Sequence, residues 1–400
     1  MIPALSALPQ RVLMTADTVG GVLTYALDLC RGLVARDVHV ILATMGGPLP
    51  AHARETLAAL GHRVHVHESD YRLEWMDDPW ADVDTAGEWL LELECEYAPH
   101  LIHLNGYAHA ALPWSAPILV VAHSCVYSWW RAVKQSAPPE SWHRYHAAVR
   151  RGLEHADLVV APSHAMLATL EHNYGCTTNG RVIHNGRSPV TDPGPRGRPR
   201  CIAPGTRSPF ILSVGRLWDE AKNAAALAAV ASELPWPVRL AGDVRAPDGC
   251  AGVNFANVEL LGQRPPAELA RDYERAAIYA LPARYEPFGL SALEAAGAGC
   301  ALVLGDIPSL RELWHDAAVF VPPEDTAALR EALVRLVEDE AQRAALGLLA
   351  SARARQFTAD RMTDGYLEAY GELMAATQRD VVFAGSDSAG SSYAAPPVRP

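Results

Sequence analysis

The sequence predicts two α/β domains, each with a doubly wound parallel sheet, that face each other across a cleft. The chain has 400 residues, which is too long for one ordinary core and fits two domains of about 150–200 residues. Half of the residues are hydrophobic and a fifth are charged, as in globular proteins. Short apolar runs alternate with amphipathic stretches, and this order favours parallel strands covered by helices on both faces.

The first predicted domain comprises residues 1–186. Its apolar runs have the length of buried strands, and the stretches between them have helical periodicity. Strands are predicted at residues 11–15, 38–44, 62–67, 101–104, 116–122, 157–163 and 181–186. Helices are predicted at residues 22–36, 51–60 and 88–97, with a helix-rich region between the strands at 116–122 and 157–163.

A stretch rich in Pro, Gly and Arg then interrupts the pattern, so residues 187–209 are predicted to be a linker. The pattern resumes in a second domain, residues 210–357. Strands are predicted at residues 210–215, 237–242, 257–262, 277–282, 300–305 and 317–322, and helices at 223–234, 266–276, 290–299, 325–341 and 342–356.

The chain after the second domain is predicted to form one more helix and a tail. The helix occupies residues 358–378, with Thr358 as its N-cap and its body at 359–377. Residues 379–400 have few large apolar side chains and are predicted to be disordered.

Charge and composition exclude several functional classes. The net charge of -12 disfavours a nonspecific nucleic-acid binder, which needs clustered Lys and Arg. No apolar run reaches the roughly 18 residues of a membrane span, and the N-terminus lacks the basic region of a signal peptide. We expect at most peripheral membrane contact. Seven cysteines without a CxxC pair indicate free thiols and a cytoplasmic protein.

Two features of the first domain follow predicted strands, where parallel sheets present their ligand-binding groups. Gly20 and Gly21 separate the first strand from a helix, so that backbone N–H groups can approach an anion there. A simple tight turn explains these glycines equally well. His123 follows the strand at 116–122 directly, where a structural and a catalytic histidine are both reasonable interpretations.

A basic pair opens the second domain. Arg216 and Lys222 follow its first strand, and such a pair at the mouth of a cleft suits a diphosphate. An ordinary charged loop is the alternative, because the neighbouring Asp219 and Glu220 can pair with both cations.

The segment ARYEPFGLSALEAAGAG, residues 283–299, places Glu286 before a predicted helix and Glu294 inside it. The N–H groups of Phe288, Gly289 and Leu290 would be free to bind a phosphate at the helix N-terminus. A carboxylate on an apolar helix face is expected to meet a hydroxyl donor such as ribose. Taken alone, the segment is also compatible with two exposed glutamates.

Together these motifs resemble the GT-B glycosyltransferases, specifically the retaining enzymes of glycosyltransferase family 4 (glycosyl transferases group 1). The resemblance covers about residues 11–375 and follows the order of the family. It rests on the Gly-Gly loop, the AHS histidine, the Arg–Lys pair, the E-x7-E segment and GDIPSLRELW at 305–314. One departure concerns the basic pair, because the family usually has four residues between Arg and Lys and this sequence has five.

The resemblance implies a role for each residue. Arg216 and Lys222 would bind the donor diphosphate and stabilise the leaving group, while Glu286 and His123 would lie beside the donor sugar. Glu294 would hold the nucleotide ribose, and the backbone of Phe288, Gly289 and Leu290 would contact sugar and phosphates. Gly20 and Gly21 would approach donor phosphate and acceptor. The first domain would bind the acceptor and the second the nucleotide sugar, with the last helix crossing back to the first domain.

The activity implied is transfer of a hexosyl group from a nucleotide-diphosphate sugar, with UDP as the expected nucleotide, to an acceptor hydroxyl with retention. The acceptor would be a small molecule, a saccharide or a lipid-linked sugar. No cofactor is expected, because Arg and Lys would replace a metal. A sugar phosphorylase or sugar-nucleotide epimerase of the same fold is one alternative, and a non-catalytic nucleotide-sugar binding partner is another.

Two further patterns have metal-binding interpretations. Asp82-Val83-Asp84 is a D-x-D string, which holds a divalent metal in another glycosyltransferase fold, but Asp84 is also a reasonable N-cap for the following helix. His65 and His67 alternate along a predicted strand and share one face of it. Exposed strand positions explain these histidines better than a metal site.

Overall fold

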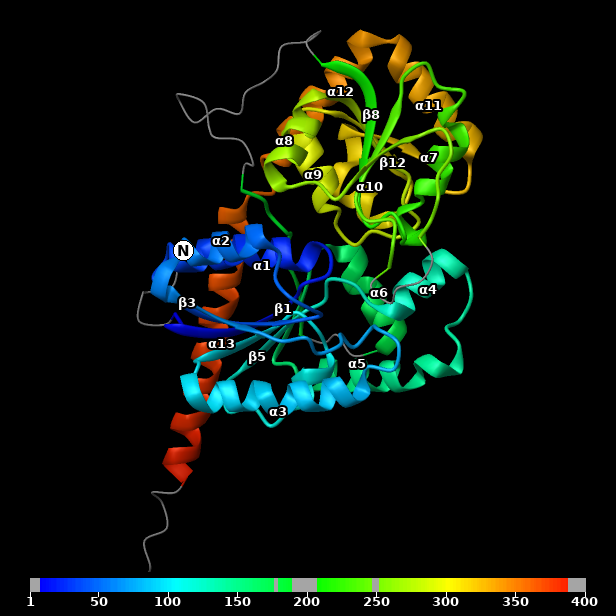
Figure 1. Cartoon of the computed structure of the whole chain (residues 1–400). Helices are drawn as coiled ribbons and strands as arrows, with labels where there is room; N and C mark the ends of the chain where they lie inside the picture. Colours follow the sequence, from blue (N-terminus) through cyan, green and yellow to red (C-terminus); the bar gives the residue numbers. More distant parts are fainter. Residues whose placement is uncertain (1–7, 176–178, 189–206, 247–251, 388–400) are drawn as a thin grey trace, which may run out of the picture.

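The computed structural model describes residues 8–175, 179–188, 207–246 and 252–387. It contains two α/β domains stacked on each other, each built on a twisted sheet (Figure 1). Every strand pair in both sheets is parallel. The predicted fold class is confirmed. Most of the predicted linker, residues 189–206, lies outside the described residues.

The first sheet has the strand order β3-β2-β1-β4-β5-β6-β7. Both faces are buried, because alternate residues of each strand meet helices on opposite sides. Val12 and Met14 pack toward α1 and α13, and Leu13 packs toward α3 and α5. The strands are β1 (Arg11–Asp17), β2 (His39–Met45), β3 (Val64–Glu68), β4 (Leu101–Leu104), β5 (Ile118–Val121), β6 (Leu158–Ala161) and β7 (Gly180–Val182).

The helices of the first domain are α1 (Gly21–Val34), α2 (Ala51–Ala58), α3 (Trp80–Tyr97), α4 (Val126–Lys134), α5 (His143–His155) and α6 (His164–Tyr174). Short 3-10 turns lie at Gly61–Arg63, Ala108–Ala111 and Glu140–Trp142.

The second sheet has the order β10-β9-β8-β11-β12-β13. Its strands are β8 (Ser208–Val214), β9 (Val238–Ala241), β10 (Glu259–Gly262), β11 (Ala276–Leu281), β12 (Ala301–Gly305) and β13 (Val319–Val321). Its helices are α7 (Ala224–Ala231), α8 (Pro266–Arg275), α9 (Leu290–Gly297), α10 (Pro308–Trp314), α11 (Thr326–Glu338) and α12 (Glu340–Ala354), with 3-10 turns at Glu220–Lys222 and His315–Ala317.

Aspartates begin the two long helices of the second domain. The carboxylate of Asp325 accepts a hydrogen bond from Ala328 N–H at 2.8 Å, and Asp339 accepts one from Gln342 N–H at 2.8 Å. These caps satisfy backbone donors that a helix leaves unpaired in its first turn. Asp339 also separates α11 from α12 with non-helical backbone.

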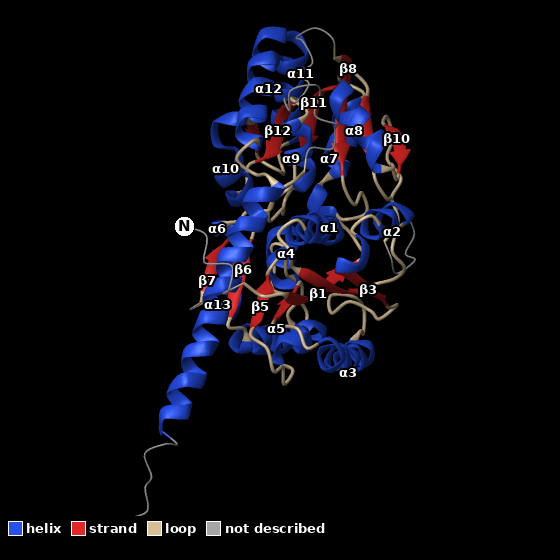
Figure 2. Cartoon of the chain, turned by 90° about the vertical axis from the view of Figure 1, so that its left-hand side faces the viewer, coloured by secondary structure: helices blue, strands red, loops and turns tan. Residues whose placement is uncertain are grey.

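The last helix, α13 (Ala359–Asp387), leaves the second domain and runs along the first (Figure 2). Tyr366 and Tyr370 are fully buried in the first-domain core. Tyr370 also forms a hydrogen bond of 2.6 Å with His103 Nδ1. The approach to α1 is close, since a Cβ on Gly32 would come within 2.0 Å of Thr363 Oγ1.

Several local predictions differ from the structure. Helices α6 and α10 were not predicted, and the two pack against each other across the domain boundary. Helix α13 reaches Asp387, so residues 379–387 of the predicted tail are helical, and residues 388–400 lie outside the described part. Helix α3 begins at Trp80, so Asp84 lies inside it, and the N-cap predicted at Asp84 is wrong.

Candidate functional site

A cleft of about 1300 Å³ lies between the two domains, and side chains from both line it. All ten residues predicted for the site contribute to this one cleft. They are Gly20, Gly21, His123, Arg216, Lys222, Glu286, Phe288, Gly289, Leu290 and Glu294.

The sheet topology explains why residues so distant in sequence meet. In each sheet the strand order reverses once, between β1 and β4 and between β8 and β11. Gly20 follows β1 and Arg216 follows β8, so both lie at a switch point, where α/β sheets open a crevice. Glu286 follows β11 beside Arg216, and His123 follows β5 on the other side of the cleft.

Arg216 lies between the two domains with its guanidinium held on both sides. Its Nη2 donates to Asp219 Oδ2 at 2.8 Å. Its Nη1 lies against Gly20, where an added Cβ would be 3.3 Å away. Gly20 has a φ of 88°, a backbone conformation that glycine adopts without strain. Glycine is therefore favoured at this position both by the positive φ and by the nearby Arg216 guanidinium.

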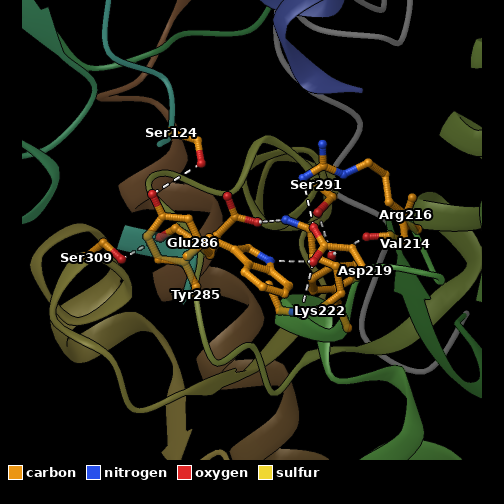
Figure 3. Close-up of polar contacts among 12 residues, drawn as sticks. Ser124, Val214, Arg216, Asp219, Lys222, Tyr285, Glu286, Ser291 and Ser309 are labelled. Carbon is orange, nitrogen blue, oxygen red and sulfur yellow. Dashed lines mark hydrogen bonds and ion pairs between the residues drawn. The ribbon is translucent and has the colours of Figure 1, made fainter. Parts of the chain in front are cut away.

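Lys222 ends a 3-10 turn and reaches Glu286. Its Nζ lies 2.6 Å from Glu286 Oε2, and the two side chains are 16% and 11% exposed. The longer Arg-to-Lys spacer is taken up by two successive turns, in which Asp219 N–H donates to Arg216 C=O and Lys222 N–H to Asp219 C=O. These turns return Lys222 to the cleft (Figure 3).

Asp219 joins the basic pair to the first domain. Burial opposes its ionisation, but Arg216, Lys222 and a hydrogen bond from Trp129 Nε1 outweigh burial and lower the pKa of Asp219. The Trp129 bond is 2.8 Å long and comes from α4. In the sequence Asp219 is only a neutralising neighbour of the basic pair, whereas in the structure it connects Arg216 to Trp129 of the first domain.

The N-terminus of α9 opens into the cleft. The helix begins at Leu290, and Gly289 precedes it with a φ of 88°. The first-turn N–H groups of a helix have no partner within it and carry partial positive charge. Phe288 directs its side chain into the core against Phe357, so its contribution to the cleft comes from the backbone.

Glu294 meets an arginine that sequence analysis missed. Arg187 Nε and Nη2 both contact Glu294 Oε1, at 2.8 and 2.6 Å. The same guanidinium pairs through Nη1 with Asp28 of α1, whose side chain is fully buried. No local pattern signals this contact, because 107 residues separate Arg187 from Glu294.

His123 is held as a neutral ring. Burial lowers its pKa to about 3. Its Nε2 lies 2.8 Å from Asn105 Oδ1, and Asn105 Nδ2 donates to Thr15 C=O. Since the amide oxygen can only accept, His123 carries its proton on Nε2 and keeps Nδ1 as an acceptor. A ring of this kind can accept a hydrogen bond but does not supply a positive charge.

Asp17, at the end of β1, is a further carboxyl group in the cleft. Burial raises its pKa to about 7, and Glu74 adds to this rise, whereas a hydrogen bond from Trp75 Nε1 and the charge of Arg216 lower it. Its position at the carboxyl end of β1 is the same kind of signal that points to His123.

The two domains are joined around the cleft by polar contacts. Ser124 Oγ donates to Tyr285 OH at 3.2 Å (Figure 3). Lys134 Nζ lies 2.7 Å from Glu220 Oε1. Glu312 of α10 accepts from the backbone N–H groups of His164 and Ala165 at the start of α6. The unpredicted helices α6 and α10 therefore contribute directly to domain contact.

The D-x-D string lies in the first turns of α3. Asp82 accepts a hydrogen bond from Arg72 N–H, and Asp84 lies 3.5 Å from Arg144. His65 and His67 both pack against Tyr97. Within the ranges that the structure describes, no group of three or more His, Cys, Asp or Glu side chains is arranged to hold a metal.

Other predictions concern the whole chain. Cys30, Cys95, Cys125 and Cys300 are free thiols, while Cys176, Cys201 and Cys250 lie outside the described residues. Among the described helices, none combines the length and apolar character that crossing a bilayer requires.

Solved structures share this two-domain architecture. Sucrose-phosphate synthase from Thermosynechococcus elongatus superposes with a TM-score of 0.70 at 21% identity, covering 94% of this chain and 100% of that one. Anabaena Alr3699/HepE, solved with UDP and glucose, has a TM-score of 0.67 at 16% identity, with 90% and 99% covered. At these identities the likeness shows the fold, which is GT-B.

Sequence comparison gives the family. Residues 19–189 match Glycosyltransferase Family 4, and residues 208–339 match Glycosyl transferases group 1. The chain belongs to the glycosyltransferases of the family 4 type.

Curated relatives match over a shorter stretch. The O-antigen chain mannosyltransferase B of Escherichia coli is 30% identical over 113 residues, which are 28% of this chain and 30% of the relative. The D-inositol 3-phosphate glycosyltransferase of Corynebacterium diphtheriae is 33% identical over 138 residues, 33% of this chain and 32% of the relative. The matched segments therefore span about a third of these relatives.

Proposed function

We propose that the protein transfers a hexosyl group from a nucleotide-diphosphate sugar to an acceptor hydroxyl, with retention of anomeric configuration and without a metal. UDP is the nucleotide we expect. The observation that carries the proposal is the meeting of Arg216, Lys222 and the N-terminus of α9 in one cleft. Three sources of positive potential around one space suit a diphosphate.

The basic groups would act on the leaving group. Negative charge develops on the diphosphate as its bond to the anomeric carbon breaks, and fixed positive groups stabilise that charge without reorganisation. Arg216 is held by Asp219 and by the Gly20 loop, so its guanidinium is already oriented. These two cations would supply the charge that a metal supplies elsewhere, which supports the metal-independent reaction.

In the proposed reaction, one bond breaks and one bond forms on the same face of the sugar. The bond from the anomeric carbon to the diphosphate oxygen breaks, and a bond to the acceptor oxygen forms on the same face. The acceptor proton passes to a diphosphate oxygen. Glu286 would contact the donor sugar and Glu294 the ribose. Neutral His123 would accept a hydrogen bond from a sugar hydroxyl, in agreement with its tautomer.

The acceptor would lie against the first domain. Trp75, Trp129, Trp130 and Trp142 line that side of the cleft, and aromatic faces pack well on sugar rings. A saccharide, a small hydroxylated molecule or a lipid-linked sugar fits this surface. The free thiols suit a reducing compartment, and we place the reaction in the cytoplasm.

The test is release of nucleoside diphosphate from UDP-, GDP-, ADP- and TDP-sugars with a panel of sugar and polyol acceptors. We expect release with one donor, an unchanged anomeric configuration by NMR, and full activity in EDTA. Arg216→Ala should abolish most turnover, while Arg330→Ala, which removes an exposed ion pair with Glu233 outside the cleft lining, should not. Absence of release from every donor would refute the proposal. Phosphate-dependent release of sugar phosphate would instead indicate a phosphorylase.

A further inference from the structure

Arg187 lies where the two connections between the domains meet. Its backbone pairs with Thr358 as an isolated parallel bridge. Its N–H donates to Phe357 C=O, and its C=O accepts from Ala359 N–H, both at 3.2 Å. Among the described residues, Arg187 thus links the chain that leaves the first domain to the chain that returns to it through two backbone hydrogen bonds.

The residue before it makes this meeting possible. A Cβ on Gly186 would lie 2.0 Å from the backbone oxygen of Thr358 and 2.3 Å from its carbonyl carbon. Only glycine lets the two backbones come so close. The position of the Arg187 backbone is thus fixed sterically.

The Arg187 side chain joins helices from both domains. It contacts Glu294 of α9 on one side and Asp28 of α1 on the other. Arg187 is 17% exposed, Glu294 12% and Asp28 not at all. Helices α1 and α9 both begin at the cleft, with Gly21 and Leu290 as their first residues.

The surrounding charges favour a charged Arg187 guanidinium that is held between the two carboxylates. Burial opposes the charge on Arg187, but Glu294 and Asp28 outweigh burial and raise its pKa. Arg31 also pairs with Asp28 at 3.0 Å, so two arginines contact the carboxylate that anchors Arg187. The rigid guanidinium can hold two carboxylates at set angles, which a lysine ammonium cannot do.

We propose that Arg187 is a positioning residue for the donor site: it orients the Glu294 carboxylate toward the ribose hydroxyls, with Asp28 of the other domain as its anchor. The Arg187 contacts at 2.8 and 2.6 Å both use Oε1 of Glu294, and Oε2 is the oxygen that we assign to a ribose hydroxyl. The proposal rests on the function proposed above, and it adds that ribose recognition depends on a residue at the domain junction.

A purely structural ion pair would behave differently. Its loss would weaken binding of every nucleotide equally, because it would change the population of folded or closed protein. Loss of a positioned carboxylate would affect only the part of affinity that comes from ribose hydroxyls. A pair of nucleotides that differ only in those hydroxyls separates the two cases.

The experiment compares calorimetric affinities for UDP and 2′,3′-dideoxy-UDP, with the matching ADP and GDP pairs run in parallel. In the wild-type protein we expect the ribose hydroxyls to strengthen binding roughly 10- to 100-fold, as for hydrogen bonds to a charged group. In Arg187→Met the same ratio should fall to about threefold or less, as in Glu294→Gln. Binding of the dideoxy nucleotide should be unchanged, which also reports that the variant is folded.

Two further variants serve as controls. Arg187→Lys keeps a positive charge between the carboxylates but lacks the fork, and its ratio should lie between wild type and Arg187→Met. Arg181→Met removes a different ion pair, with Glu372 of α13, and should leave the ratio at the wild-type value.

The outcomes separate this inference from the proposed function. If the wild-type protein shows a ribose ratio that Arg187→Met and Arg187→Lys both retain, Arg187 does not position Glu294, and the proposed function stands. If the wild-type protein binds none of the nucleoside diphosphates, the proposed function itself fails, and the inference with it.

Discussion

Glu286→Gln should tighten binding of free UDP while it slows transfer of the sugar. In the structure Glu286 neutralises Lys222 at 2.6 Å, so a diphosphate must compete with this carboxylate for the ammonium. Glutamine has nearly the same shape but no charge. The substitution therefore frees Lys222 for phosphate and removes a negative group beside it, whereas the charge-assisted hydrogen bond to the donor sugar is lost.

The size of the effect follows from the distance. A phosphate oxygen about 3 Å from Lys222 Nζ would lie roughly 5–6 Å from Glu286 Oε2. At that separation, unit charges repel by about 0.7 kcal/mol in water and about 3 kcal/mol at the effective dielectric of a protein surface. Because the cleft is open to solvent, we expect the lower part of this range, a gain of roughly 5- to 10-fold in UDP affinity.

Isothermal titration of UDP into wild type, Glu286→Gln and Lys222→Met measures this directly. Lys222→Met should bind UDP more weakly than wild type, which shows that Lys222 is the group released. Glu324→Gln is the matched control, because it removes a carboxylate from an exposed ion pair with Arg284 in the same domain and should leave UDP affinity unchanged. UDP binding to Glu286→Gln that is equal to or weaker than wild type would refute the competition between Glu286 and diphosphate.

Three further predictions concern stability. His103 is fully buried between Tyr25 and Tyr370, and burial lowers its pKa to about 3; the unfolded chain therefore binds the extra proton below about pH 6.5, and stability should fall by up to about 1.4 kcal/mol per pH unit between pH 6.5 and 3. Urea unfolding of His103→Gln should lack this component, and equal slopes in both proteins would contradict the assignment. Burial raises the pKa of Asp17 to about 7, so its stabilising contribution is complete at low pH and is lost between about pH 4 and pH 7. Asp17→Asn should therefore gain melting temperature relative to wild type across this pH range, and a constant difference would exclude such a shift. Gly186→Ala should destabilise the protein by at least about 3 kcal/mol in urea unfolding, because its Cβ would overlap Thr358 C=O; a near-neutral effect would show that the junction can relax.

The sequence predicts the parts of the fold that depend on local periodicity. Strand β11 is an uninterrupted apolar run and β2 is largely apolar, and their alternation with helices is visible without any contact information. Helices α6 and α10 were missed. Helix α10 has only seven residues and begins at Pro308, so its periodic signal is weak.

The candidate site also contains residues that the sequence predicts and partners that it does not predict. Arg216, Glu286 and His123 follow strands, and strand ends are predictable from the sequence. The partners that hold them are not, because Trp129 lies 90 residues before Asp219 and Arg187 lies 159 residues after Asp28. Such contacts depend on how two domains are placed, which periodicity does not encode. Asp17 was within reach, since it stands at the end of β1.

The return of α13 to the first domain bears on how the protein folds during its own synthesis. Tyr366 and Tyr370 complete the first-domain core, yet the ribosome makes them after the entire second domain. The first domain therefore cannot complete its core before the second domain is made, whereas N-terminal domains usually fold first as a unit. The second domain, whose core lies within residues 210–357, can finish first. Until α13 is made, the α1 face of the first-domain sheet stays partly uncovered.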